Sequence, residues 1–300
     1  MNKWMSRALV GAAGVVTVAA AALAAGLGLA ELKLRRQVEV PMHAIVIPAG
    51  AVALERGAYL YNSRGCAACH GADGAGRAFI ETERLQVRAP NISPGPGNVV
   101  AAYRPEDWER AIRHGVKPNG RPLFIMPSED YNRLTDADLG ALVAYVTKLP
   151  PATGGGLSAR LPIEVRIAYG FGIVTDAAHK IDHRRPVQQP VPEGVTPEHG
   201  AYVAAVCTGC HGGGLGGGKI PGVPPSWPAA ANLTPGDGSV LPRYPDEQSF
   251  VTMMRSGVRP DGSTVSREMP FTTFRTMSDV DLRATYVYLK SLPGRRFGER

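Results

Sequence analysis

All four cysteines of this 300-residue chain lie in two copies of one pentapeptide, Cys66-Ala-Ala-Cys69-His70 and Cys207-Thr-Gly-Cys210-His211. Each copy is a C-x-x-C-H motif, in which two thiols can form thioether bonds to the vinyl groups of a haem while the adjacent imidazole ligates the iron. Because the two copies use every cysteine, the sequence predicts two covalently attached haem c groups, with His70 and His211 as iron ligands.

Paired cysteines have two other common uses. A structural zinc ribbon places its cysteine pairs about 15–20 residues apart, whereas these pairs lie in opposite halves of the chain. A redox-active dithiol explains neither the adjacent histidine nor the duplication of the motif. Both alternatives are therefore disfavoured.

The two halves of the chain also match outside the haem motifs. Gly57-Ala-Tyr-Leu60 recurs as Gly200-Ala-Tyr-Val203, shortly before each motif. Further pairs keep nearly the same offset along the chain: Asn91–Gly95 with Asn232–Gly236, Gly115–Gly120 with Gly257–Gly262, Leu134–Leu139 with Met277–Leu282, and Leu149-Pro150 with Leu292-Pro293. A nearly constant offset of this kind indicates a duplicated structural unit. We therefore predict a first domain at residues 48–150, a linker at 151–194 and a second domain at 195–295.

Both repeats have the features of helical segments. Thr135 and Ser278 are each followed three residues later by an aspartate, a pattern close to the helix-starting capping box. An earlier helix is expected in each repeat, over Pro105–His114 and Asp246–Ser256, because each begins near a proline with acidic residues and stops at a glycine. Few segments alternate with a period of two, and the Gly- and Pro-rich stretches between motifs predict loops. The expected fold class is all-α.

This arrangement resembles the class I cytochrome c family, and specifically the membrane-anchored di-haem cytochromes c that accompany periplasmic dehydrogenases. The resemblance covers about residues 50–150 and 195–295. It implies two tandem all-α domains, each folded around one haem. It also implies that a methionine well downstream of each motif, often followed by proline, is the second axial ligand. Met126-Pro127 and Met269-Pro270 occupy matching places downstream of the two motif histidines.

The repeat distinguishes these two methionines from core methionines, which fill gaps between apolar side chains. Met254 aligns with Ile112, as interchangeable apolar residues do, whereas Met126 and Met269 align with each other. A thioether ligand favours the reduced ion, so both reduction potentials should lie on the high side of the haem range.

The resemblance suggests one supporting contact, a proline carbonyl that orients each iron-binding imidazole through its other ring nitrogen. Pro90 is the candidate in the first domain, and Pro224 or Pro225 in the second. The remaining histidines carry no repeated signal, and we expect them to be structural or solvated. They are His114, which aligns with Ser256, and His43, His179, His183 and His199, which lie in the juxtamembrane segment or the linker.

Residues 1–36 contain an apolar segment, in which the run Ala8–Ala30 carries no charged residue. A helix of that length extends about 34 Å, enough for a hydrocarbon core of about 30 Å. We expect a retained membrane anchor. A cleaved signal peptide is the alternative, because Ala22-Leu-Ala24 or Gly28-Leu-Ala30 could be its cleavage site, although its apolar part usually runs only about 7–15 residues. By the resemblance, both haem domains lie on the periplasmic side of the bacterial inner membrane.

The predicted linker is long for a simple tether. Gly154-Gly-Gly156 predicts flexibility, and Ile163–Val174 could form a short packed segment. We therefore expect that the linker can lie across both domains.

The formal net charge of +7 raises the question of an anionic partner. Residues 1–36 contribute +4 of that charge, and two haems would add about four propionate charges, so the exterior of the haem domains is roughly neutral. The sequence also contains no basic stripe interleaved with aromatic residues, and nucleic acid binding is not expected.

Two functions fit these features. The first is an electron carrier, not itself an enzyme, that relays single electrons from a periplasmic dehydrogenase or other donor to the respiratory chain or a terminal oxidase. The second is a di-haem enzyme, such as a peroxidase or thiosulfate dehydrogenase, in which one iron is open to substrate. The matched methionines favour the carrier, because a six-coordinate iron has no vacant position for substrate.

Overall fold

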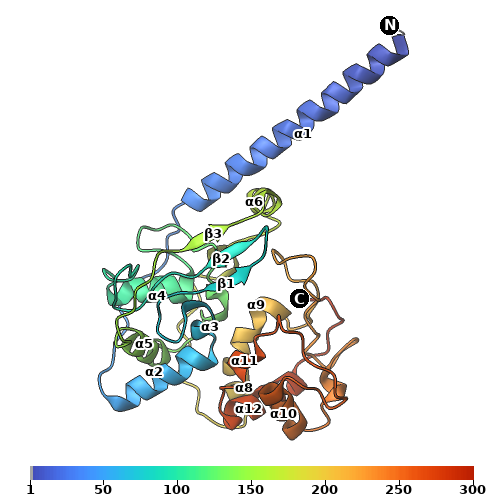
Figure 1. The fold of residues 1–300 in the computed structure, drawn as a ribbon. Coiled ribbons are helices and arrows are strands. Elements are labelled where there is room, and N and C mark those ends of the chain that lie inside the picture. Colours follow the sequence, from blue (N-terminus) through green and yellow to red (C-terminus); the bar gives the residue numbers. More distant parts are fainter. Residues whose placement is uncertain (1–2) are drawn as a thin grey trace.

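The computed structural model describes residues 3–300 as a long N-terminal helix attached to a globular body (Figure 1). Helix α1 (Lys3–Arg35) projects from this body, and large apolar side chains along it, such as Val15, Val16 and Leu23, are exposed. By length and composition alone, the Val10–Arg35 part of α1 can cross a membrane. The predicted apolar helix is therefore present.

The first globular unit surrounds the first haem motif. Helix α2 packs against α5, and Gly57 makes their close approach possible, because a Cβ atom there would lie 2.1 Å from the carbonyl oxygen of Ala141. The fully buried Leu60, Leu139 and Val143 lie in the core between these helices. The helices of this unit are α2 (Ala51–Ser63), α3 (Cys66–His70), α4 (Pro105–His114), the 3-10 helix η1 (Ser128–Asp130) and α5 (Asp136–Val146).

The second globular unit repeats this packing around a core of its own. Helix α8 packs against α12, and a Cβ atom at Gly200 would lie 2.0 Å from the carbonyl oxygen of Ala284. The repeated Gly-Ala-Tyr segment is thus the point where two helices approach closely in each unit. The helices here are α8 (Pro197–Val203), η2 (Ala204–Cys207), α9 (Thr208–His211), η3 (Leu241–Arg243), α10 (Glu247–Ser256), α11 (Phe271–Phe274) and α12 (Asp279–Ser291).

The predicted helix starts are confirmed. The hydroxyl oxygen of Thr135 accepts the backbone N–H of Asp138 at 3.1 Å, and that of Ser278 accepts the N–H of Asp281 at 3.0 Å. Helix α4 has the predicted bounds, and α10 begins directly after its predicted first residue, Asp246, which caps it. Side chains that satisfy the first free N–H groups of a helix fix where it begins.

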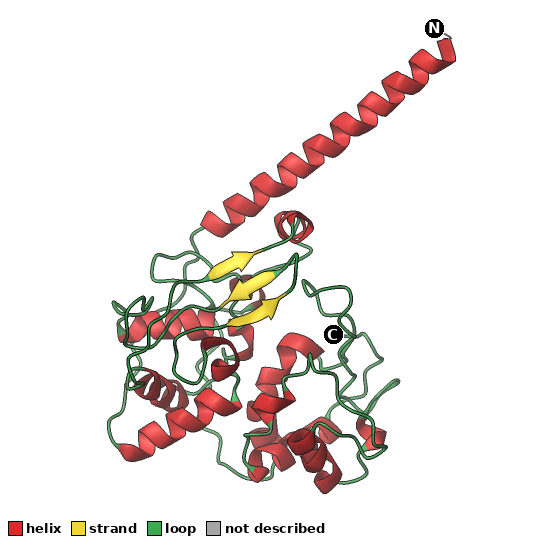
Figure 2. Ribbon diagram, viewed as in Figure 1, coloured by secondary structure: helices red, strands yellow, loops and turns green. Residues whose placement is uncertain are grey.

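The described residues are mostly helical but also contain a small sheet, which the all-α prediction did not include (Figure 2). Strands β1 (Ala78–Glu81), β2 (Gln86–Arg88) and β3 (Ser158–Arg160) pair antiparallel in the order β1-β2-β3. Each has three or four residues, too few for a period of two to be recognised in the sequence. Val87 in the central strand is 2% exposed, so its side chain lies in the interior of the protein.

Residues 151–194 pack against the rest of the protein. Besides β3, they contain α6 (Ile163–Gly170), which lies against α1, and α7 (Ala177–Lys180), which lies against η1. The prediction of a short packed segment is therefore confirmed. Gly154 also packs closely, because a Cβ atom there would lie 2.1 Å from the carbonyl oxygen of Ala75.

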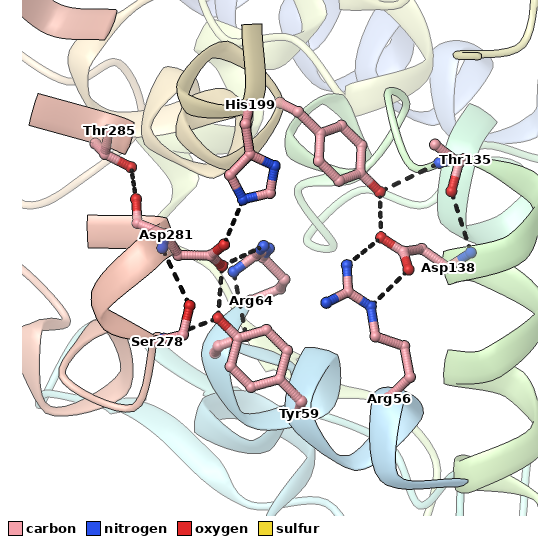
Figure 3. A network of polar contacts seen from close by, with 11 residues as sticks. Arg56, Tyr59, Arg64, Thr135, Asp138, His199, Ser278, Asp281 and Thr285 are labelled. Atoms are coloured by element: carbon pink, nitrogen blue, oxygen red, sulfur yellow. Dashed lines mark hydrogen bonds and ion pairs between the residues drawn. The ribbon is translucent and has the colours of Figure 1, made fainter. Parts of the chain in front are cut away.

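The two units meet through contacts that they exchange (Figure 3). The hydroxyl of Tyr59 in α2 donates to Asp281 Oδ2 at 2.5 Å, and the hydroxyl of Tyr202 in α8 donates to Asp138 Oδ2 at 2.5 Å. The same offset along the chain relates the two tyrosines to each other and the two aspartates to each other. Reciprocal contacts between equivalent residues are typical of a twofold interface.

Each aspartate of this interface also has a partner in its own unit. Arg56 forms two hydrogen bonds to Asp138, at 2.7 and 2.8 Å, and His199 Nε2 lies 2.7 Å from Asp281 Oδ1. Arg64 breaks the symmetry, because its buried guanidinium donates to Asp281 at 2.8 Å across the interface. Burial alone would raise the pKa of Asp281, but the Arg64 charge and the hydrogen bonds outweigh it, and the pKa is lowered.

Candidate haem attachment sites

The first motif forms a short helix of its own. Helix α3 lies between Gly65 and Gly71, whose φ angles of 89° and 80° favour glycine. Because Cys66, Cys69 and His70 lie within this single turn, it presents both thiols and the imidazole together. This is the arrangement needed to hold one macrocycle by its edge and by its metal.

The second motif is presented in a similar way. Cys207 is the last residue of η2, and Cys210 and His211 belong to α9, which ends before Gly212 with a φ angle of 83°. Cys207 packs against the core of the second unit, as Cys66 packs against that of the first. Each unit therefore places one motif at the edge of its own core.

The imidazole of each motif is oriented by a backbone carbonyl group from the loop that follows. His70 Nδ1 lies 3.0 Å from the carbonyl oxygen of Pro90, and His211 Nδ1 lies 2.7 Å from that of Ala231. A carbonyl oxygen can only accept, so Nδ1 carries the hydrogen, and Nε2 keeps its lone pair for a metal ion. Burial lowers the pKa of both histidines, which favours the neutral form that ligates metal.

The carbonyl prediction is confirmed for Pro90 and wrong for Pro224 and Pro225. The acceptor is a backbone oxygen, which any residue can supply, so the second loop needs no proline at this position. The offset between the two haem motifs also relates Pro90 to Ala231. That shared offset was the signal that could have identified Ala231.

Two pairs of residues that support these loops were not predicted. Gly76 and Gly217 donate their N–H groups to the carbonyl oxygens of His70 and His211, at 2.8 and 2.9 Å. A Cβ atom would lie 2.2 Å from the Ala89 oxygen at Gly76 and 2.4 Å from the Ala230 oxygen at Gly217. The second pair is the fully buried Asn91 and Asn232, whose side-chain amides tie each loop to the segment after α5 or α12.

The four thiols fit covalent attachment better than redox or zinc chemistry. All four cysteines are free, and burial raises the pKa of Cys66 and Cys207 to about 12. A redox-active or zinc-binding cysteine reacts as a thiolate, and a raised pKa disfavours that form. Among residues 3–300, no group of three or more His, Cys, Asp or Glu side chains is arranged to hold a metal ion. The donor set in each unit, two thiols and one neutral imidazole, thus fits haem c.

The two candidate methionines have matching environments. Met126 packs against the core of the first unit and Met269 against that of the second, the same cores that Cys66 and Cys207 contact. The carbonyl oxygen of Met126 accepts the N–H of Ser128 at 2.9 Å, and that of Met269 accepts the N–H of Phe271 at 2.7 Å. The same tight turn therefore follows both residues, as expected if they are equivalent.

Comparison with known proteins identifies the first unit. Residues 52–146 match the family model described as "Cytochrome C oxidase, cbb3-type, subunit III". The first unit is therefore a cytochrome c domain. A cytochrome c domain carries covalently bound haem c, so the match agrees with the thiols and imidazole of the first motif.

Longer similarities extend over both units of the chain. The chain is 28% identical over 279 residues to "Fructose dehydrogenase cytochrome subunit" of Gluconobacter japonicus, which covers 81% of the chain and 53% of the relative. It is 28% identical over 271 residues to "Alcohol dehydrogenase (quinone), cytochrome c subunit" of Gluconobacter oxydans (strain 621H), with 80% and 55% covered. A "Diheme cytochrome c-type" protein of Cereibacter sphaeroides is 32% identical over 107 residues, 32% of the chain and 36% of that protein. The chain spans about half the length of the first two relatives.

Several of the other histidines have polar partners within the protein. His199 lies in α8 and pairs with Asp281, so its expected place in the linker or juxtamembrane segment is wrong. His43 Nε2 lies 3.1 Å from the fully buried Glu109, and the Nδ1 atoms of His114 and His183 are 3.1 Å apart. These contacts support the expectation of structural roles.

One residue joins the two candidate sites. The carboxylate of Asp130, four residues after Met126, accepts the N–H of Gly209 at 2.7 Å and the hydroxyl of Thr208 at 3.2 Å. Gly209 lies inside the second motif. Burial raises the pKa of Asp130 to about 8. The loop that carries the first candidate methionine is therefore fixed directly to the second haem motif.

Proposed function

We propose that the chain is a membrane-anchored di-haem cytochrome c that relays single electrons from a periplasmic dehydrogenase, or another donor, to an acceptor of the respiratory chain. In each unit, the two cysteines would hold the haem covalently, and the histidine and methionine would be its axial ligands. These residues are Cys66, Cys69, His70 and Met126, and Cys207, Cys210, His211 and Met269. Bound haem c supplies reversible one-electron oxidation and reduction of iron.

The duplication of the donor set on two equivalent frameworks carries this proposal. Both histidines have the same carbonyl support, and both methionines precede the same turn. The interface brings the two motifs together, because Arg64 stands two residues before Cys66 and contacts the second unit, while Asp130 contacts the second motif. A rigid pair of adjacent redox sites is suited to passing an electron through the protein.

We further propose that residues 48–150 and 195–295 are two tandem class I cytochrome c domains, with residues 151–194 fixed across the first of them. Helix α1 would be a retained anchor of the bacterial inner membrane, with both domains on the periplasmic side. The contact of α6 with Gly26 and Ala30 supports retention, because cleavage after Ala30 would remove the surface that α6 covers.

The experiment is purification of the full chain from membranes in mild detergent. Haem quantitation should give two haems per polypeptide, and a redox titration should give two one-electron steps at high potential. Neither reduced haem should bind carbon monoxide strongly, and the protein that co-purifies identifies the donor. One haem per chain would disprove the di-haem assignment. Strong carbon monoxide binding would favour the di-haem enzyme, because it requires an open iron position.

A further inference from the structure

Helix α6 lies against the part of α1 that belongs to the uncharged run (Figure 1). A Cβ atom at Gly170 would lie 2.0 Å from the carbonyl oxygen of Gly26 and 3.2 Å from the N atom of Ala30. Between residues 11 and 30, Gly26 and Ala30 are the two residues that are buried. Small residues four positions apart allow two helices to approach closely, as in membrane helix pairs.

This contact fixes the depth of α6 relative to the apolar run. Ala30 is the last residue of the run, and Gly26 lies four residues earlier, which is about 6 Å along the helix axis. Under the proposed function, on which this inference rests, α1 spans a bilayer. The C-terminal end of α6 must then lie about as deep as an interfacial helix, which enters the headgroup and acyl boundary by about 5–10 Å.

Three side chains of this segment are apolar and exposed, beside the exposed charged residues Glu164 and Arg166. Ile163 is 54% exposed, Phe171 is 50% exposed and Ile173 is 74% exposed. Ile163, Ile167 and Phe171 follow one another at intervals of four residues and share a face of α6. The last two approach Gly26, so this face continues directly from the contact with α1.

Charged groups lie next to this apolar surface, on residues that follow the end of the uncharged run Ala8–Ala30. Lys33 Nζ donates to the carbonyl oxygen of Tyr169 at 3.1 Å, and Arg36 pairs with the buried Asp176 at 2.7 Å. An apolar surface bordered by basic residues is typical of segments that lie in the membrane interface.

We propose that Ile163–Ile173 is a second membrane contact, seated in the lipid boundary beside the point where α1 leaves the bilayer. The occupant of this surface is lipid, because the surface is continuous with the face of α1 that the bilayer itself covers. Two points of attachment restrict tilting of the haem units and hold them in one orientation to the membrane.

The test uses a spin label on the full-length holoprotein in nanodiscs of phosphatidylethanolamine and phosphatidylglycerol. The four native cysteines are consumed by thioether bonds, so Ile173→Cys provides a single reactive thiol. Accessibility of the label to dissolved oxygen and to a water-soluble nickel chelate is measured by power saturation. Val258→Cys, 40% exposed on the second unit, is the aqueous control, and Val16→Cys, 67% exposed on α1, is the lipid control.

We expect the Ile173 label to be about tenfold less accessible to nickel than the Val258 label, because a charged chelate is excluded from an apolar phase, while remaining accessible to oxygen. Equal nickel accessibility at the two positions, with Val16 protected, would overturn the membrane contact and leave the anchor intact. Nickel access at Val16 would disprove the anchor itself. Protection of Ile173 from both nickel and oxygen would show that protein, not lipid, covers this surface.

Discussion

Tyr59 and Tyr202 occupy equivalent positions in the two repeats, and each donates its hydroxyl hydrogen to an aspartate of the other repeat. The acceptors, Asp281 and Asp138, stand in the first turns of α12 and α5. Each tyrosine oxygen also accepts the backbone N–H of the residue that caps that helix, at 2.9 Å from Ser278 and 3.4 Å from Thr135. The chain is thus built like a twofold dimer within one polypeptide, and the interface fixes the spacing of the two haem motifs.

Removing one of these hydroxyls should weaken the interface. Tyr59→Phe should lower the free energy of unfolding by about 1.5–3 kcal/mol, the usual value of a hydrogen bond to a charged group. Tyr202→Phe should have a similar effect, measured by urea denaturation of the detergent-solubilised holoprotein. Tyr145→Phe is the control, because that ring packs on Tyr61 within the first unit. If the free energy of unfolding is unchanged in both Tyr59→Phe and Tyr202→Phe, the tyrosine contacts do not hold the two units together.

The interface should also weaken in acid. Hydrogen bonds and ion pairs outweigh burial and lower the pKa of Asp138 and Asp281 in the folded protein. In the unfolded chain an aspartate has a pKa of about 3.9. A carboxylate whose pKa is lower than this in the folded protein stabilises the fold above that pH. The stabilisation is lost as the pH falls through the pKa of the carboxylate in the folded protein. The free energy of unfolding should therefore decrease below about pH 4.

The origin of this loss can be tested with Asp281→Asn. The variant should be less stable than the native protein at neutral pH, because the buried Arg64 loses its charged partner, which typically costs about 3–5 kcal/mol. Between neutral and acidic pH, its free energy of unfolding should also decrease by less than that of the unmodified protein. The exposed Asp237→Asn serves as the control. An unchanged acid dependence in Asp281→Asn would show that other carboxylates cause the loss.

Features that recur in the two repeats could be read from the sequence. The haem motifs, the caps at Thr135 and Ser278 and the carbonyl contact of Pro90 all depend on local sequence or a constant offset. Gly57 and Gly200 are equivalent glycines of the repeat, and the structure shows why each is a glycine: two helices approach closely there.

Features that join distant segments could not be read in this way. The pairing of β3 with β2 depends on three residues of the linker, with no distinctive pattern of their own. The exchanged tyrosine contacts were equally hidden, because a repeat shows that Tyr59 and Tyr202 are equivalent but not that each contacts the opposite unit. Ala231 was missed because the relevant group is its backbone oxygen and not its side chain.

The support of the second histidine provides a further prediction. Gly217 has a φ angle of 74°, and a Cβ atom there would lie 2.4 Å from the oxygen atoms of Ala230 and Ala231. Gly217→Ala should therefore strain the loop by about 1–3 kcal/mol and displace the carbonyl that orients His211. Haem content should fall from two towards one per chain. Gly213→Ala is the matched control, because its Cβ atom would meet nothing within 4 Å. Full haem content in Gly217→Ala would contradict a role for this carbonyl.

The proposed axial ligands can be distinguished from core methionines by substitution. Met126→Ala should remove about half of the methionine-sulfur charge-transfer absorption of the oxidised protein, because one of two equivalent thioether ligands is lost. The same variant should open one iron to carbon monoxide and lower one reduction potential, since the thioether favours reduced iron. Met254→Ala is the control: that side chain is 5% exposed in the second core, and its loss should reduce stability but leave the absorption intact. Full charge-transfer absorption in Met126→Ala would show that another residue ligates the first iron.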